Sequence, residues 1–352
     1  MTNTNPTNEL SRRTVLQTGV AAMAAAGIAP FVRAAPRWDP KNPVIGTGEH
    51  QYECIHDWAV LPGTHAFGNT HGIAFDSKGN CHIKHTVNAS SSSADAICVF
   101  DPSGKFVRSW GAEYRGGAHG LTLSKEKDGE FLWLADCNRS VVQKTTLEGK
   151  VVIDLAWPEA SGLYNNKGEY KPTNVAVFPS GPHAGRIYVA DGYGKSWIHE
   201  FNAKGEYQRS FGGPGNNRGQ VRCPPGIGID MRGGEPSIVV ADRSNRRLQY
   251  FTLDGRHMNF VTAELRSPCH FDFRGDLILI PDLEARVTLF NKKNEMVAQL
   301  GDGTNFGLRD KPRDQFIPGK FIAPHSAAFD KDGNIYVVEW VEVGRVTKLR
   351  KV

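Results

Sequence analysis

Short runs of alternating hydrophobic and polar residues, separated by turns rich in Gly, Asp and Asn, recur along most of this chain. The segment HGIAFDSKGNCHI from His71 has an alternating run, a tight turn and a second apolar run. Alternation with period two predicts half-buried β-strands, and such turns favour hairpins. The same plan begins again at His119, Asn174, Gly226, His270 and His325. The pattern therefore predicts six similar antiparallel units.

Each unit continues into further strands. Third strands are expected at Ile97–Asp101, Ile198–Asn202, Leu248–Thr252, Val287–Asn291 and Val346–Leu349, and fourth strands at Phe106–Gly111, Tyr207–Gly212 and Met296–Gly301. Six units of four strands predict an all-β fold, a six-bladed β-propeller, because radial repetition leaves few exposed sheet edges. The last unit reaches the C-terminus with three strands, so Tyr52–Val60 is expected to supply the fourth and close the ring. A β-sandwich is the alternative fold, and no substantial helix is expected.

The first 35 residues have the pattern of a secretory signal rather than of a folded unit. Ser11-Arg12-Arg13-Thr14-Val15-Leu16 is typical of a twin-arginine signal, and the apolar run from Gly19 to Pro30 is too short to span a bilayer. We therefore expect a signal peptide at 1–35, a linker at 36–50 and the propeller at 51–352. The expected partner of the signal is the twin-arginine export machinery, and the expected location is periplasmic or secreted.

Charge and composition narrow the class of protein. The formal net charge is +5, and about +3 remains once Arg12, Arg13, Arg33 and Glu9 are removed with the signal. This balance gives no case for binding nucleic acid. No later apolar run is long enough for a membrane span, so the mature chain is expected to be soluble. The six cysteines form no C-x-x-C pair. Most are expected to be small buried residues, and Cys81 with Cys98 is the expected disulfide if one forms.

Four histidines occupy the same place in the repeat, just before or at the first strand of their units: His71, His119, His270 and His325. In a ring of blades that place faces the central axis, so the four imidazoles are expected to converge. A single histidine before a strand is usually a polar cap, but four of six equivalent positions indicate a shared role. Imidazole suits zinc, iron and copper. We expect a divalent metal, with zinc first and iron or copper as alternatives.

The repeats resemble the NHL-repeat family, and within it the lyase domain that cleaves peptidyl-α-hydroxyglycine to a peptide amide and glyoxylate. The resemblance is closest from Pro172-Thr173-Asn174-Val175-Ala176-Val177 to Tyr188-Val189-Ala190-Asp191-Gly192-Tyr193. It implies a zinc ion held by three histidines and a catalytic tyrosine, which matches Tyr193. His119 and His325 match two of the zinc ligands.

This chain departs from the family at other positions. The third zinc ligand aligns with Pro225, and the family's catalytic arginine falls near Thr86. An aspartate of the family is Ser326 here, which argues against a calcium site like the family's. His71 and His270 lie at pore positions where the lyase does not use histidine.

Several residues are candidates for catalysis. Tyr193 is the predicted acid/base, because a phenol near a metal and another cation can have a lowered pKa. Lys84 and His85 follow the second strand of the first unit and are candidates for a replacement charge. Arg115 is a candidate for binding an anionic group of the substrate. Each also has a structural interpretation, as a packed turn tyrosine, a core residue or a solvated arginine.

Acidic residues recur at the ends of second strands, at Asp136, Asp191, Asp242, Asp282 and Glu339. Repetition in five units favours a structural role, in which carboxylates accept hydrogen bonds from backbone N–H groups.

These observations favour an exported, metal-dependent enzyme of the lyase or hydrolase type that acts on a small-molecule or peptide substrate. One alternative is an iron- or copper-dependent oxidoreductase that uses all four pore histidines. The other is a non-enzymatic propeller scaffold that presents loops to a ligand or protein.

Overall fold

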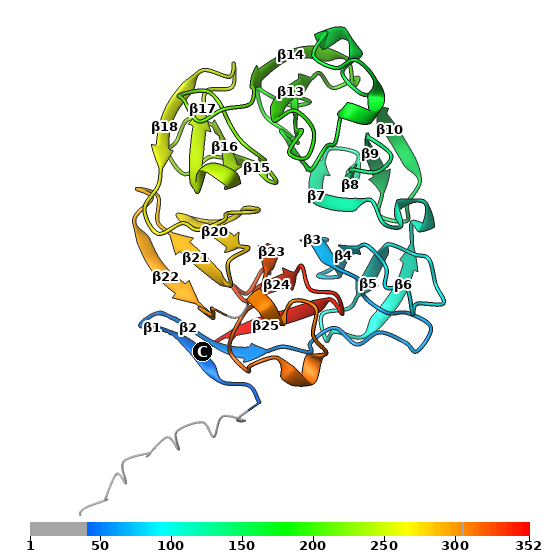
Figure 1. The fold of residues 1–352 in the computed structure, drawn as a ribbon, viewed down its shortest axis with the longest axis vertical. Helices are drawn as coiled ribbons and strands as arrows, with labels where there is room; N and C mark the ends of the chain where they lie inside the picture. Colours follow the sequence, from blue (N-terminus) through cyan, green and yellow to red (C-terminus); the bar gives the residue numbers. More distant parts are fainter. Residues whose placement is uncertain (1–40, 305) are drawn as a thin grey trace, which may run out of the picture. The chain divides into compact units, whose positions relative to one another are not determined.

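Six antiparallel sheets surround a central axis in the computed structural model, which describes residues 41–304 and 306–352 (Figure 1). The predicted six-bladed propeller is therefore confirmed, and the predicted signal peptide at 1–35 lies outside the described residues. Blades one to three consist of β3 (Thr70–Phe75), β4 (Cys81–His85), β5 (Ile97–Phe100) and β6 (Phe106–Trp110); β7 (Ala118–Glu126), β8 (Gly129–Asp136), β9 (Val141–Thr146) and β10 (Val151–Leu155); and β11 (Asn174–Val177), β12 (Ile187–Ala190), β13 (Trp197–Phe201) and β14 (Tyr207–Gly212). Blades four and five consist of β15 (Ile227–Asp230), β16 (Ser237–Asp242), β17 (Arg247–Phe251) and β18 (His257–Val261); and β19 (Asp272–Arg274), β20 (Leu277–Asp282), β21 (Arg286–Phe290) and β22 (Met296–Leu300).

Blade six joins the two ends of the described chain. Its inner strands are β23 (Pro324–Phe329), β24 (Ile335–Glu339) and β25 (Arg345–Lys351), and β2 (His50–Ile55) pairs with β25 in antiparallel register. The predicted ring closure by an N-terminal strand is thus confirmed. A further strand, β1 (Val44–Thr47), pairs with the outer edge of β2. The expectation that 36–50 is a linker is therefore wrong for Val44–Thr47. The outer edge of β2 offers backbone groups with which this segment pairs as a strand.

The hydrophobic core is divided among the interfaces between neighbouring blades. Second and third strands are mostly buried, and β4 and β5 are buried along their whole length, because each sheet packs against a sheet on both faces. Outer strands such as β6 are only half-buried. Ile83 of blade one, for example, packs with Val338 of blade six, and Leu134 of blade two packs with Ile97 of blade one. Burial on both faces fixes each blade against its neighbours and holds the inner strands at the axis.

Helical structure in the described part of the chain consists of three-residue 3₁₀ turns. These are η1 (Ala112–Tyr114), η2 (Glu159–Ser161), η3 (Lys167–Glu169), η4 (Arg243–Asn245), η5 (Phe306–Leu308) and η6 (Arg313–Gln315). None of the helices in residues 41–304 and 306–352 has the length and hydropathy needed to cross a membrane.

All six cysteines are free thiols, so the expected Cys81–Cys98 disulfide is wrong. Cys81 pairs across the strands with Phe100, whereas Cys98 pairs with Ile83.

The acidic residues at second-strand ends hold backbone N–H groups, as their repetition predicted. Asp282 accepts hydrogen bonds from the N–H groups of Arg266 and Ser267, and Asp191 accepts them from Lys171 and Lys195. Asp136, Asp242 and Glu339 do the same with other residues. In four blades the acid thereby fixes the segment that enters the innermost strand, and with it the residues that face the axis.

Candidate metal centre

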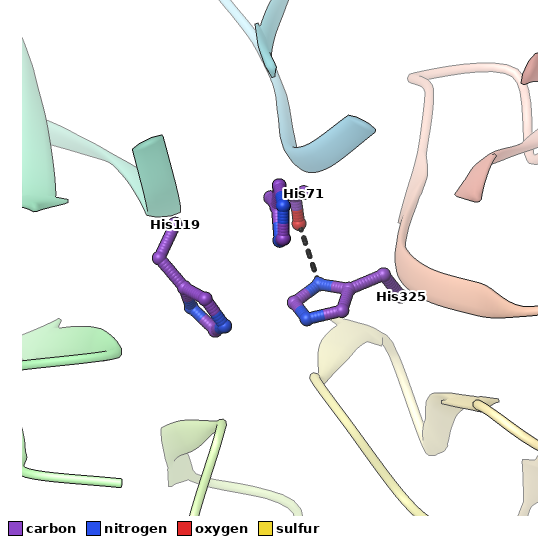
Figure 2. Close-up of side chains that lie close together, drawn as sticks. All are labelled: His71, His119 and His325. Carbon is purple, nitrogen blue, oxygen red and sulfur yellow. Dashed lines mark hydrogen bonds between the residues drawn. The ribbon is translucent and has the colours of Figure 1, made fainter. Parts of the chain in front are cut away.

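Three histidines from three neighbouring blades point toward one another at the axis (Figure 2). His71, His119 and His325 each offer one ring nitrogen, and these nitrogens all lie within 4.8 Å of one another. The ring centroids are 5.0 Å apart for His71 and His119, 4.6 Å for His71 and His325, and 4.7 Å for His119 and His325. All three side chains are buried. Three imidazoles in this arrangement can bind a metal ion and leave a coordination position open.

A β-bulge places each of these three histidines. The register between the first and second strands shifts between Thr70 and Gly72 in blade one, and between Pro324 and Ser326 in blade six. The corresponding shift in blade two lies between Ala118 and Leu121. A bulge leaves a residue out of the ladder and re-aims its side chain. The three interrupted registers therefore turn the imidazoles out of the blade interfaces and toward the axis.

Hydrogen bonds to backbone carbonyl oxygens fix two of the imidazoles. Nδ1 of His119 lies 2.7 Å from the carbonyl oxygen of Thr173, and Nδ1 of His325 lies 3.0 Å from that of His71. A carbonyl oxygen only accepts, so both Nδ1 atoms carry the proton and both Nε2 atoms keep a lone pair. Nε2 of His325 and Nδ1 of His71 are buried and have no hydrogen-bond partner within the described residues. This donor set fits a metal ion, because metal-binding histidines commonly donate the other ring N–H to a carbonyl oxygen.

The three imidazoles are neutral at neutral pH. Burial lowers the pKa of His71 and of His119 well below 6.5, and the neighbouring His325 adds to both shifts. Burial, together with the Arg243 guanidinium, lowers the pKa of His325 to about 3. Metal ligation requires the neutral form of imidazole. Protons therefore do not compete strongly with a metal for His325 above about pH 4.

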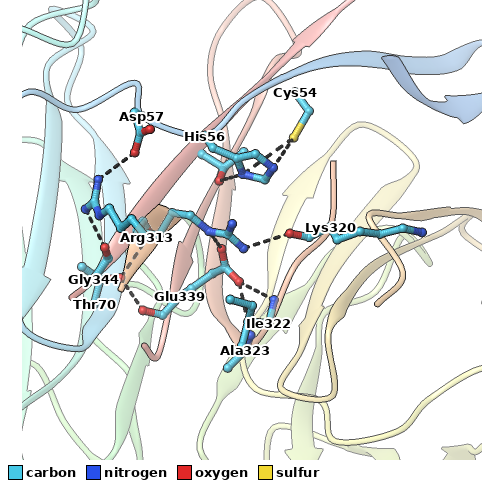
Figure 3. Close-up of polar contacts among 12 residues, drawn as sticks. Cys54, His56, Asp57, Thr70, Arg313, Lys320, Ile322, Ala323, Glu339 and Gly344 are labelled. Atoms are coloured by element: carbon cyan, nitrogen blue, oxygen red, sulfur yellow. Dashed lines mark hydrogen bonds and ion pairs between the residues drawn. The ribbon is translucent and has the colours of Figure 1, made fainter. Parts of the chain in front are cut away.

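A buried ion pair anchors the segments that carry His71 and His325 (Figure 3). The Glu339 carboxylate accepts hydrogen bonds from the N–H groups of Ile322, at 2.7 Å, and Ala323, at 3.2 Å, and it pairs with the Arg345 guanidinium. The carbonyl oxygen of Glu339 accepts a 2.7 Å hydrogen bond from the Thr70 hydroxyl. One residue thus holds the chain next to His71 and the chain leading to His325.

Tyr193 lies beside the triad, as the sequence placed it. Its hydroxyl is 3.0 Å from Nε2 of His119, and Nη1 of Arg243 is 3.5 Å from the same hydroxyl oxygen. The sequence predicted a lowered pKa for this phenol. Burial instead raises the pKa of Tyr193 to about 12, although Arg243 opposes this effect. Although the residue is 42% exposed, its hydroxyl points at a buried imidazole, so loss of solvent outweighs the nearby cation.

Arg243 is the cation of this site, and the sequence prediction missed it. Its guanidinium lies 2.9 Å from Sγ of Cys223 and 3.9 Å from Sγ of Cys269, and 5.4 Å from the Tyr193 ring centroid. Among the described residues it has no carboxylate partner, unlike Arg247, which pairs with Asp242. Arg243 directly follows the repeated acid Asp242, just as Gly192-Tyr193 follows Asp191. The position of Arg243 next to a repeated acid could therefore have identified it from the sequence as a residue near the axis.

His270 lies outside the triad. It lies two residues before β19, between the isolated bridge of Pro268 with Asp282 and the first paired residue of the strand, Asp272. His270 instead lines an axial cavity of about 210 Å³ together with Asp272, Thr122 and apolar residues of blades one, two, five and six. Burial lowers the pKa of His270 to about 4 and raises that of Asp272 to about 6. The structure therefore brings together three of the four predicted histidines and leaves His270 outside the triad.

The structure places the candidate charges Lys84 and His85 inside blade interfaces. Nζ of Lys84 donates to the carbonyl oxygens of Ala135, at 2.5 Å, and Gly120, at 3.3 Å, and burial lowers its pKa to about 7. Nδ1 of His85 accepts from the N–H groups of Gly68 and Val87, and burial lowers its pKa to about 3. Lys84 thus ties blade one to blade two, and His85 is a core residue. Neither side chain is one of the three that converge at the axis.

Arg115 is exposed in the loop before β7. Its backbone N–H donates to Ala112, and its side chain makes no hydrogen bond or ion pair with the described residues. The structure neither joins it to the triad nor gives it a structural partner.

Comparison with known proteins relates the chain to amidating enzymes. No protein-family profile matches it. Peptidylglycine alpha-amidating monooxygenase from Rattus norvegicus is 26% identical over 330 residues, which are 85% of this chain and 32% of the relative. Peptidyl-glycine alpha-amidating monooxygenase A from Xenopus laevis is 30% identical over 256 residues, which are 68% of this chain and 25% of the relative. A probable peptidyl-alpha-hydroxyglycine alpha-amidating lyase from Caenorhabditis elegans is 30% identical over 162 residues, 44% of this chain and 43% of the relative.

These relatives confirm the resemblance to amidating enzymes, and the NHL-type propeller fits the fold. The chain spans about a quarter to a third of the length of the two monooxygenases. Among solved structures, a catalytically inactive virginiamycin B lyase from Staphylococcus aureus with quinupristin has a TM-score of 0.56 and 14% identity, and covers 86% of this chain and 100% of its own. At that identity the likeness shows the shared propeller fold alone.

Proposed function

We propose that this chain is a metal-dependent enzyme of the lyase or hydrolase type, which acts on a small-molecule or peptide substrate at a carbon that bears oxygen. The observation that carries the proposal is the triad of His71, His119 and His325 on three bulged strands. Two of its buried ring nitrogens lack a partner. Buried polar atoms without partners are costly, and a bound cation removes that cost. A divalent ion held there supplies a Lewis acid for a substrate oxygen.

Zinc is the first ion to test, with iron and copper next, since imidazole suits all three. An oxidative iron or copper site would use four converging pore histidines. The geometry favours it less, because His270 lies apart from the other three.

Tyr193 and Arg243 are the residues proposed to act on the substrate. With a pKa of about 12, the Tyr193 phenol is protonated at neutral pH, so it is suited to donate a proton to a leaving group. Arg243, without a carboxylate partner, is suited to bind an anionic group such as a carboxylate. Nη1 of Arg243 is 3.5 Å from the Tyr193 hydroxyl oxygen, so a substrate held by Arg243 would present its neighbouring atoms to that hydroxyl.

The names of the relatives suggest a first probe. An N-acyl-α-hydroxyglycine carries a hydroxyl on the carbon between an amide nitrogen and a carboxylate. Cleavage of its carbon–nitrogen bond moves the hydroxyl proton to the amide nitrogen and yields an amide and glyoxylate. The carboxylate suits Arg243, and the leaving nitrogen suits a proton donor such as Tyr193.

The test is glyoxylate release from α-hydroxyhippurate by the purified mature chain, measured before and after metal removal and reloading. We expect release that needs the metal and that falls at least about 100-fold in His119→Ala and in Tyr193→Phe. Arg209→Met, at a half-exposed arginine of blade three, is the control and should retain activity. A wild-type protein that keeps its fold but binds no metal tightly would contradict the proposal.

Export is the second part of the proposal. It rests on the twin-arginine pattern at Arg12-Arg13. Replacing both arginines by lysine should keep the chain inside the cell with its signal uncleaved. Unchanged export of this variant would exclude the twin-arginine route.

A further inference from the structure

We propose that Thr173 is a positioning residue that couples His119 to Tyr193. The carbonyl oxygen of Thr173 accepts a hydrogen bond from the His119 imidazole, and its hydroxyl accepts one from the turn that carries Tyr193. This inference deepens the proposed function and rests on it for the roles of His119 and Tyr193. The contacts themselves stand on geometry alone.

The carbonyl side of Thr173 faces blade two. Thr173 is fully buried directly before β11. Its carbonyl oxygen accepts the hydrogen bond from Nδ1 of His119 at 2.7 Å and a second one from the Gly120 N–H at 2.9 Å. Two donors from successive residues fix both the ring plane and the backbone of the bulge. Nε2 of His119 is thereby directed at Tyr193 and at the centre of the triad.

The hydroxyl side of Thr173 faces blades three and four. Oγ1 lies 2.8 Å from the carbonyl oxygen of Pro224 and 3.0 Å from that of Ala190, and it accepts from the Gly192 N–H at 3.2 Å. A hydroxyl has one proton and two lone pairs. It therefore donates to one carbonyl oxygen at a time and keeps a lone pair for Gly192, the residue next to Tyr193.

Close packing makes this contact specific. A Cβ atom on Gly192 would lie 2.2 Å from the Pro224 carbonyl oxygen and 2.6 Å from Oγ1 of Thr173. A Cβ atom on Gly120 would lie 2.5 Å from the Thr173 carbonyl oxygen. Glycine is needed at both Gly120 and Gly192 because the backbone at each position lies too close to Thr173 to leave room for a side chain. The N–H of Tyr193 itself donates to the Lys171 carbonyl oxygen at 3.3 Å, and the Lys195 N–H closes the turn by donating to Asp191 at 2.6 Å.

Blade one offers a contrast. Thr70 has the corresponding place before His71 and is also fully buried. Its hydroxyl donates to the carbonyl oxygen of Glu339 in blade six. It joins two blades but anchors no turn that bears a residue of the site. Only in blade three does the threonine link a triad histidine to the tyrosine turn.

The test compares Thr173→Val, which removes the hydroxyl, with Thr173→Ser, which keeps it. Thr145→Val is the control, because Thr145 is a fully buried threonine of β9 whose hydroxyl makes only a 3.5 Å contact with Leu132. The readout is nitration of Tyr193 by tetranitromethane in the metal-free folded protein, followed by peptide mass spectrometry. We expect about five-fold faster nitration in Thr173→Val, as for loss of one buried hydrogen bond, and rates near wild type in Thr173→Ser and Thr145→Val. Zn²⁺ binding should stay at one ion per chain in all variants, because the carbonyl oxygen is kept.

Equal nitration of wild type and Thr173→Val would overturn the proposal, and so would an equal rise in Thr145→Val. If Thr173→Val does not fold, hydrogen exchange at the Gly192 amide of the wild type decides. We expect this amide to be protected, and exchange at the rate of an exposed amide would overturn the proposal. Neither readout uses metal or substrate. Failure of metal binding would therefore sink the proposed function and leave the Thr173 result standing, and the reverse also holds.

Discussion

The hydroxyl of Tyr193 lies 3.0 Å from Nε2 of His119, the same nitrogen that this histidine offers to a metal ion. Nδ1 of His119 is protonated because it faces the Thr173 carbonyl oxygen, so Nε2 has a single lone pair. That lone pair serves either the phenol proton or a cation, and not both. The tyrosine and a metal ion would therefore compete for His119, and a bound ion would free the Tyr193 hydroxyl to interact with a substrate.

Replacing Tyr193 by phenylalanine should consequently strengthen metal binding. Loss of one neutral hydrogen bond is worth about 1 kcal/mol, so we expect the Kd for Zn²⁺ to fall by about two- to ten-fold, measured by competition with a chelator dye. Tyr188→Phe is the control, since the hydroxyl of Tyr188 in blade three donates to the carbonyl oxygen of Leu253 in blade four. Weaker binding in Tyr193→Phe would mean that the phenol supports the metal rather than competing with it.

The Glu339–Arg345 pair should matter for stability more than any surface ion pair. Both side chains are fully buried. Glu339→Gln leaves the guanidinium without its counter-charge, which typically costs about 3–5 kcal/mol, measured as the free energy of unfolding in urea. The matched control is Asp57→Asn. Asp57 pairs with Arg313 but is 73% exposed, so the cost there should be below about 1 kcal/mol. Equal losses in the two variants would contradict the anchoring role of Glu339.

The stability of the metal-free protein should fall as the pH is lowered through 6.5. Burial lowers the pKa values of His85 and His199 to about 3, whereas in the unfolded chain they titrate near 6.5. Below pH 6.5 the unfolded state binds protons that the folded state does not, so the stability present above pH 6.5 is lost progressively toward pH 3. Urea midpoints at pH 7, 6, 5 and 4 measure this. His199→Gln should flatten the slope, and an unchanged slope would argue against a neutral buried His199.

The repeat predicted the ring, its closure and three of the four axial histidines, because one residue position recurs at the same place in every blade. It could not separate His270 from His71, His119 and His325. The sequence pattern is the same at all four positions, whereas the packing of the blades brings only three of the imidazoles together.

The charges of the site were harder to predict than its histidines. Lys84 and His85 were candidates for a replacement charge because they lie at the end of a second strand, but both side chains are buried in blade interfaces. Arg243 lies one residue beyond the acid of blade four and reaches the Tyr193 hydroxyl of blade three. Such a contact joins two blades through a long flexible side chain, and strand periodicity says nothing about its direction.

The central claim is that His71, His119 and His325 form one metal site from which His270 is excluded. Its most direct test is the metal content of protein purified after expression with zinc, iron and copper, for wild type and the four single His→Gln variants. We predict one tightly bound ion per chain in wild type and in His270→Gln, and loss of that ion in the other three variants. Retention of the ion in His325→Gln, or its loss in His270→Gln alone, would contradict the account.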